Sequence, residues 1–103
     1  MSGFEVVALV EDVPPGTGRA VEVEGRAVAL FNVDGTFYAI DGTCLHRGGP
    51  VGEGDLDEAI VTCPWHGWQY DVTTGRNVMD PDIGLEQHEV EVENGVVKVA
   101  LND

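Results

Sequence analysis

Basic residues are scarce in this 103-residue chain: five lysines and arginines face nineteen aspartates and glutamates, for a formal net charge of −14. Nucleic acids and anionic membranes bind basic patches, so we expect neither as a partner. The acidity suits two roles, docking to a basic protein surface and simple solubilisation. Composition alone favours the second.

Long apolar runs are also lacking. No segment approaches the roughly 20 apolar residues that cross a bilayer, and the start MSGFEVVALVED lacks the basic and apolar regions of a secretory signal. We therefore expect a cytoplasmic protein. Only two cysteines are present, and in that compartment they are more often thiols or metal ligands than a disulfide. A chain of this length holds one core, so residues 1–103 are predicted to form a single domain. We also expect a monomer.

Convincing helical periodicity is absent, and short strand-like runs take its place. FEVVAL (4–9) and the alternating AVEVEG (20–25) are typical of strands. Asp34-Gly35 and Asn94-Gly95 each separate two apolar runs, a strong signal for a β-hairpin. Residues 55–61 come nearest to a helix but are too short to form one alone. The sequence predicts an all-β fold, a sandwich or small barrel.

Glycines, prolines, both tryptophans and both cysteines gather in residues 42–82. Each cysteine has a histidine close by: Cys44-x-His46, then sixteen residues, then Cys63-x2-His66. A structural zinc accepts such a set, although zinc sites usually pair cysteine with cysteine and histidine with histidine. A Cys44–Cys63 disulfide leaves the histidines without a role, and a cysteine nucleophile needs only one histidine. A 2Fe–2S cluster with two cysteines on one iron and two histidines on the other uses all four.

CLH (44–46) and CPWHGW (63–68) resemble the two cluster-binding loops of Rieske iron–sulfur proteins. The resemblance covers nearly the whole chain and implies a Rieske domain of three small antiparallel sheets, with a cluster-binding subdomain at approximately 42–82. It implies one 2Fe–2S cluster, with Cys44 and Cys63 on the inner iron and His46 and His66 on the outer iron. Zinc stays the alternative metal.

Other residues resemble the low-potential branch of that family. Respiratory Rieske proteins carry a disulfide between positions that are Gly49 and Trp65 here, and a serine donor where this chain has Trp68. Tyr70 matches a tyrosine that donates to a cysteine sulfur. Fewer donors to sulfur stabilise the reduced state less, so the resemblance implies a potential in the lower half of the Rieske range, roughly −150 to 0 mV.

Within that branch, 103 residues leave no room for the catalytic iron domain of a terminal oxygenase. The resemblance therefore implies an electron-transfer component rather than an enzyme. Such a ferredoxin passes single electrons from a flavoprotein reductase to a terminal aromatic-ring oxygenase. From the charge of −14 we expect both partners to dock through basic surfaces. The alternatives are the small subunit of an assimilatory nitrite reductase and a zinc-stabilised β interaction module.

Several residues near the motifs have expected roles of their own. We expect Trp68 to cover the cluster and Gly67 to let the backbone approach it closely. Pro81 lies either in a third loop over the cluster or in an ordinary turn. His88 is expected on a strand, with its ring facing solvent.

Overall fold

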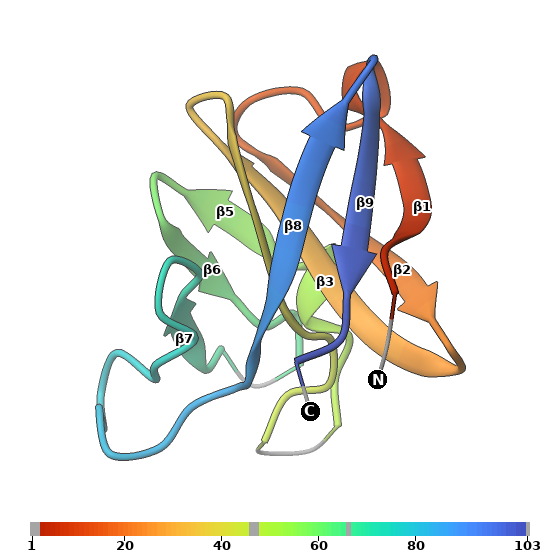
Figure 1. Ribbon diagram of the computed structural model, residues 1–103. Helices are drawn as coiled ribbons and strands as arrows, with labels where there is room; N and C mark the ends of the chain where they lie inside the picture. Colours follow the sequence, from red (N-terminus) through yellow and green to blue (C-terminus); the bar gives the residue numbers. More distant parts are fainter. Residues whose placement is uncertain (1–2, 46–47, 66, 103) are drawn as a thin grey trace.

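The computed structural model describes residues 3–45, 48–65 and 67–102, and within them the chain forms nine antiparallel strands and two short 3-10 turns (Figure 1). The all-β prediction is confirmed. The larger sheet has the order β1-β9-β8-β4-β3-β2. Its strands, in chain order, are β1 (Glu5–Leu9), β2 (Thr17–Val23), β3 (Arg26–Val33), β4 (Thr36–Asp41), β8 (Gln87–Glu93) and β9 (Val96–Ala100). The smaller sheet consists of β5 (Asp55–Asp57), β6 (Ile60–Thr62) and β7 (Gln69–Asp71). The 3-10 turns are η1 (Val10–Asp12) and η2 (Val51–Glu53).

The hairpin predictions at Asp34-Gly35 and Asn94-Gly95 are confirmed. All four residues have a positive φ, between 52° and 95°, as a type I′ turn requires. Glu24-Gly25 makes an equivalent turn between β2 and β3. Residues 55–61, the nearest approach to a helix, instead form most of the β5–β6 hairpin, where Leu56 pairs with Val61 on the face that packs against the core.

The described strands form two sheets where the resemblance implies three. Strands β4 and β8 pair at Ala39↔His88 and Ile40↔Gln87, and this short seam joins the triplet β2-β3-β4 to the triplet β1-β9-β8. The outer strands β1 and β2 contact each other, so the combined sheet curls into a nearly closed barrel.

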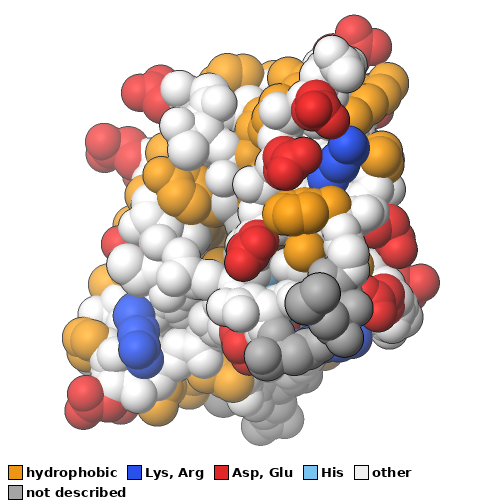
Figure 2. All heavy atoms as spheres, in the orientation of Figure 1, with side chains coloured by type: hydrophobic (Ala, Val, Ile, Leu, Met, Phe, Trp, Pro, Cys, Tyr) orange, Lys and Arg blue, Asp and Glu red, His pale blue; other side chains and the backbone are white. Residues whose placement is uncertain are grey.

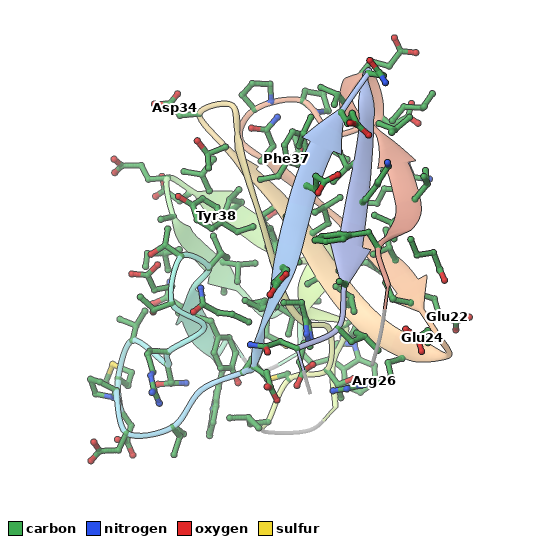
Figure 3. The ribbon with its side chains drawn as sticks, viewed as in Figure 1. Glu22, Glu24, Arg26, Asp34, Phe37 and Tyr38 are labelled. Carbon is green, nitrogen blue, oxygen red and sulfur yellow. The ribbon has the colours of Figure 1, made fainter. Side chains whose placement is uncertain are left out.

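The hairpin β3–β4 is buried on both faces, which explains its nearly continuous apolar sequence. Leu30 and Phe37 point into the barrel core, whereas Phe31 and Tyr38 pack in a second core shared with the small sheet and the cysteine loops. Figure 3 shows Phe37 and Tyr38 on opposite sides of β4. Because successive side chains of a strand alternate between faces, one hairpin can support both cores.

His88 lies on β8 as predicted, but the expectation that its ring faces solvent is wrong. Its side chain is 0% exposed, with Nε2 2.7 Å from Asp41 Oδ1. The backbone N–H of Asn102 donates to Nδ1 at 3.1 Å, so Nε2 carries the hydrogen and donates to Asp41. Arg26 Nη2 lies 3.3 Å from the same carboxylate oxygen. His88 lies two residues before Val90 on β8, and Val90 packs against the barrel core. Because side chains two residues apart on a strand share a face, the sequence could have indicated that His88 is buried.

The surface is acidic, as the composition predicts. Figure 2 shows Asp and Glu side chains spread over the visible face, with Lys and Arg confined to small separate areas. Within the described residues, no helix has the length and apolar content needed to span a membrane.

Candidate metal centre

The first cysteine loop begins directly after β4 and is closed by backbone hydrogen bonds. The N–H of Cys44 donates to the carbonyl of Gly49 at 2.9 Å, and the N–H of Gly48 donates to the carbonyl of Cys44 at 2.9 Å. Gly48 has φ +72°, a conformation that favours glycine. An isolated bridge between Thr43 and Pro50 fastens the base of this loop.

The second cysteine loop, between β6 and β7, repeats this arrangement. The N–H of Cys63 donates to the carbonyl of Trp68 at 2.7 Å, and the N–H of Gly67 donates to the carbonyl of Cys63 at 3.2 Å. Gly67 has φ +76°. Each cysteine therefore opens a closed loop with glycine four residues later, which the sequence shows in both motifs.

Both thiols are buried and lie side by side. Cys44 is 4% exposed and Cys63 is 2% exposed, and neither of these two described cysteines is in a disulfide. Burial raises the pKa of the Cys63 thiol; the Trp65 backbone N–H lowers it, and the neighbouring Cys44 thiol raises it further. Two adjacent buried sulfurs on separate loops suit a soft metal centre, because thiolates are strong ligands for iron–sulfur clusters and zinc.

Gly49 lies directly against Cys63 and Trp65 of the other loop. A Cβ at this position would lie 2.8 Å from Cys63 Sγ and 2.9 Å from Trp65 Cγ, closer than real Cβ atoms come. The two cysteine loops therefore approach each other so closely at this position that only glycine fits. Gly49 and Trp65 also face each other, so they occupy positions that a disulfide could join in a chain with cysteines there.

Tyr70 places its hydroxyl at the other sulfur. The side chain is fully buried, its Oη lies 3.3 Å from Cys44 Sγ, and Oη accepts the N–H of Leu45 at 3.2 Å. Since Oη accepts from the backbone and a thiolate can only accept, the hydroxyl donates to a deprotonated Cys44. Burial raises the pKa of Tyr70, and the side-chain contact with Cys44 raises it further. Tyr70, which matches the sulfur-donating tyrosine of the related proteins, therefore contacts the sulfur of Cys44 in this structure.

Four other residues near the cysteine motifs had been considered from the sequence: Trp65, Gly67, Trp68 and Pro81. Trp68 is half-buried and packs against the core that contains both cysteines, whereas Trp65 is exposed. Gly67 has a positive φ, which favours glycine, and a Cβ there would meet no described atom within 4 Å. Its expected close approach to a cluster stays a prediction. Pro81 is exposed in a turn closed by the Ile83 N–H and the Asp80 carbonyl at 3.1 Å.

The two predicted histidine ligands, His46 and His66, lie outside the described residues, as does Arg47. Within the described part of the chain, no group of three or more His, Cys, Asp or Glu side chains is placed to hold a metal. Of the four predicted ligands, the structure therefore describes only Cys44 and Cys63.

Known proteins support one family. A model of the Rieske [2Fe-2S] domain matches residues 3–92. Ferredoxin CarAc of Metapseudomonas resinovorans is 40% identical over 96 residues, which cover 91% of this chain and 90% of the relative. The ferredoxin component of the naphthalene 1,2-dioxygenase system of Pseudomonas aeruginosa is 34% identical over 100 residues, covering 96% and 95%.

A solved structure gives the same result. The complex of reduced oxygenase and oxidised ferredoxin in carbazole 1,9a-dioxygenase contains a chain that superimposes with a TM-score of 0.85 at 37% identity, covering 94% of this chain and 92% of the other. The twin cysteine loops, the shared fold and the family match lead to one conclusion: this chain belongs to the Rieske [2Fe-2S] domain family.

Proposed function

We propose that this protein is a one-electron carrier that passes electrons from a flavoprotein reductase to the terminal oxygenase of an aromatic-ring dioxygenase system. The observation that carries this function is the pair of identically built loops that bring two buried thiols together beside Gly49. Its relatives named as ferredoxin components favour this role over the nitrite reductase subunit and the zinc module.

We propose Cys44 and Cys63 as thiolate ligands and His46 and His66 as imidazole ligands of one Rieske-type 2Fe–2S cluster. When bound, the cluster supplies reversible uptake of a single electron. The burial of both thiols supports the cysteine assignment, and the histidine assignment rests on the spacing of the two motifs. In this proposal residues 42–82 form the cluster-binding subdomain, and the small sheet supports the second loop.

The chain contributes three things to electron transfer. The closed loops hold the two cysteines in place, which limits rearrangement at the site. The second core excludes water from the sulfurs. The Tyr70 hydroxyl donates to Cys44 Sγ, and a donor to sulfur stabilises the more negative reduced state.

We also propose that the carrier works in the cytoplasm, where thiols are kept reduced and available as ligands. The acidic surface, with a formal charge of −14, supports partners that dock through basic surfaces.

Anaerobic electron transfer tests the function. Protein reduced by NADH and a flavoprotein reductase is mixed with the oxidised oxygenase component of a carbazole or naphthalene dioxygenase system. We expect one electron per chain to pass to the oxygenase, followed by absorbance. Failure to accept an electron from the reductase, or to deliver it to either oxygenase, would contradict the proposal.

A further inference from the structure

The strand that leads into the first cysteine loop ends on a charged residue. Asp41 is the last residue of β4 and lies three positions before Cys44. The segment between them is fixed against β3. The Gly42 N–H donates to the Ala27 carbonyl at 3.0 Å, and a Cβ on Gly42 would lie 2.9 Å from the backbone of Ala27 and Val28. Three residues span at most about 11 Å between Cα atoms, so Asp41 keeps a short and constant separation from the proposed ligand Cys44.

Two side chains hold the Asp41 carboxylate in place. His88 Nε2 donates to Oδ1 at 2.7 Å, and Arg26 Nη2 lies 3.3 Å from the same oxygen. The His88 ring is neutral in this arrangement, because its Nδ1 accepts the Asn102 N–H. Asp41 and Arg26 therefore form an ion pair, and a neutral histidine fixes its negative member.

Both charges border a recess that reaches the first cysteine. The recess has a volume of about 510 Å³, and its lining includes Arg26, Asp41 and Cys44, together with Thr43 and Leu45. The Asp41 side chain is 30% exposed and that of Arg26 is 43% exposed. Because neither charge is fully surrounded by water, each acts on nearby groups more strongly than a charge in bulk solvent.

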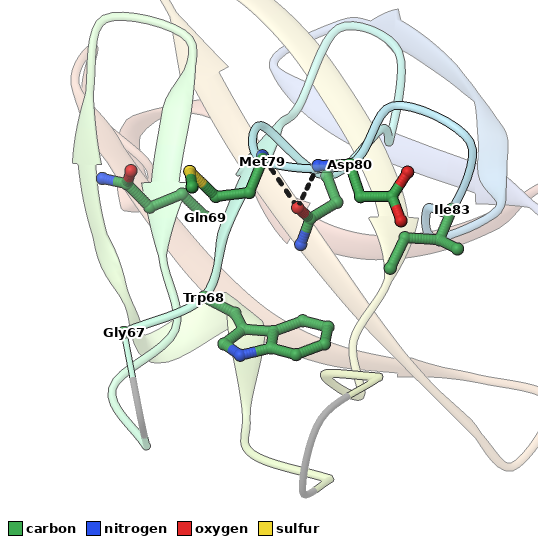
Figure 4. A pocket seen from close by; sticks show the side chains of 7 residues that line it. Gly67, Trp68, Gln69, Met79, Asp80 and Ile83 are labelled. Carbon is green, nitrogen blue, oxygen red and sulfur yellow. Dashed lines mark hydrogen bonds between the residues drawn. The ribbon is translucent and has the colours of Figure 1, made fainter.

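The second cysteine loop has different surroundings. The recess beside it has a volume of about 290 Å³ and is lined by Gly67, Trp68, Met79 and Ile83 among others. Figure 4 shows the Trp68 ring facing the loop that carries Met79 and Ile83. Asp80 also lines this recess, but no Arg or Lys is among its described lining residues. An ion pair therefore borders the cysteine recess on the Cys44 side alone of these two.

We propose that Asp41 and Arg26 tune the reduction potential of the cluster in opposite directions, and that His88 is the positioning residue for Asp41. This inference rests on the proposed cluster assignment. One electron adds one negative charge to the centre. A carboxylate nearby opposes that change and lowers the potential, whereas a guanidinium favours it and raises the potential.

The test measures the midpoint potential of charge variants by EPR-monitored titration. Asp41→Asn removes the negative charge and keeps an oxygen that accepts from His88 Nε2. At the wild-type midpoint we expect its ratio of reduced to oxidised protein to rise about threefold, a shift of roughly 30 mV for a one-electron couple. Arg26→Gln should lower the same ratio about twofold, a smaller change because Arg26 is more exposed.

Asp34→Asn is the matched control, since it makes the same chemical change in the turn after β3. Its φ of 56° suits asparagine, which is favoured before glycine in a type I′ turn. Figure 3 shows Asp34 and Arg26 at opposite ends of the strand. The eight residues of β3 span about 26 Å, more than twice the Debye length of about 10 Å at 0.1 M salt. We expect this variant to keep the wild-type midpoint.

Two further measurements separate charge from structure. Arg26→Lys keeps the positive charge and should restore the ratio to within about 1.5-fold of the wild type. Iron content, sulfide content and the EPR spectrum should be unchanged in every variant, which shows that the same cluster is being titrated.

The inference is overturned if Asp41→Asn keeps the wild-type midpoint, if Asp41→Asn and Arg26→Gln shift it in the same direction, or if Asp34→Asn shifts it as far as Asp41→Asn. If Asp41→Asn does not fold, equal midpoints for Arg26→Gln and Arg26→Lys overturn it. A wild-type protein without a reducible cluster counts against the proposed metal centre. A wild-type protein that takes up its electron but is insensitive to both charges counts against this inference alone.

Discussion

His88→Phe removes the polar centre of the seam between β4 and β8. Phenylalanine keeps an aromatic ring in the buried site but deletes both nitrogens. The substitution removes the 2.7 Å bond to Asp41 and the acceptor for the Asn102 N–H at 3.1 Å. Only two residue pairs join β4 to β8, and the bond to Asp41 adds a side-chain contact across this short seam. The bond from Asn102 ties β8 to the end of the chain.

The expected loss follows from the surroundings of each partner. A hydrogen bond to a charged group contributes about 1.5 to 3 kcal/mol, and a neutral one about 0.5 to 1.5 kcal/mol. The Asp41 side chain is 30% exposed and keeps Arg26, and Asn102 is exposed, so water replaces part of what is lost. We therefore expect the free energy of unfolding to fall by about 2 kcal/mol, and Tm to fall by roughly 8 to 16 °C for a domain of this size.

Circular dichroism of the oxidised protein, during heating and in urea, measures this loss. A double-mutant cycle with Asp41→Ala isolates the pair, with an expected coupling energy of about 1.5 kcal/mol or more. Glu89→Gln, on the exposed face of the same strand, is the matched control and should change stability by less than about 0.5 kcal/mol. A His88→Phe protein within about 0.5 kcal/mol of the wild type, or a coupling energy near zero, would refute the reasoning.

Three further substitutions and one salt series follow from the site. Cys63→Ser should give colourless protein without iron; full iron content with an unchanged EPR signal would rule out the cysteine as a ligand. Gly49→Ala places a methyl group 2.8 Å from Cys63 Sγ and should lower iron and sulfide content, whereas normal loading would show that the loops yield. Tyr70→Phe should lower the reduction potential at unchanged iron content, because it removes the donor to Cys44. Since burial raises the pKa of Tyr70 above its usual 10.0, its hydroxyl keeps its proton, and the difference from the wild type should persist at pH 10; a difference that vanishes as the pH rises to 10 contradicts this. The rate of reduction by the reductase should fall from about 0.02 to 0.5 M salt if the acidic surface steers docking, and a level rate would leave it a solubilising role.

Local features of the fold could be predicted from the sequence. Asp34-Gly35 and Asn94-Gly95 specify their hairpins because a type I′ turn depends only on the φ values of two adjacent residues. The glycines at 48 and 67 follow the same logic, since each adopts a positive φ within its own loop. The cysteine motifs identified the family because their spacing is contained in two short segments.

The features that were missed depend on contacts between distant segments. The partner of His88 is Asp41, 47 residues away, and only the β4–β8 pairing brings them together. The sequence comparison noted that Gly49 stands where respiratory Rieske proteins have a cysteine. Its close approach to Cys63 could not be predicted, because it arises where two separate loops meet. The merging of two triplets into one sheet depends on two residue pairs that no local pattern marks.

An EPR-monitored redox titration of the purified protein tests the central claim most directly, that Cys44, His46, Cys63 and His66 hold a Rieske 2Fe–2S cluster. The account predicts a brown protein that takes up one electron per two iron ions, with a midpoint potential of roughly −150 to 0 mV. A colourless zinc protein without a signal would contradict the cluster, and a midpoint near about −400 mV, as in plant-type ferredoxins, would contradict histidine ligation.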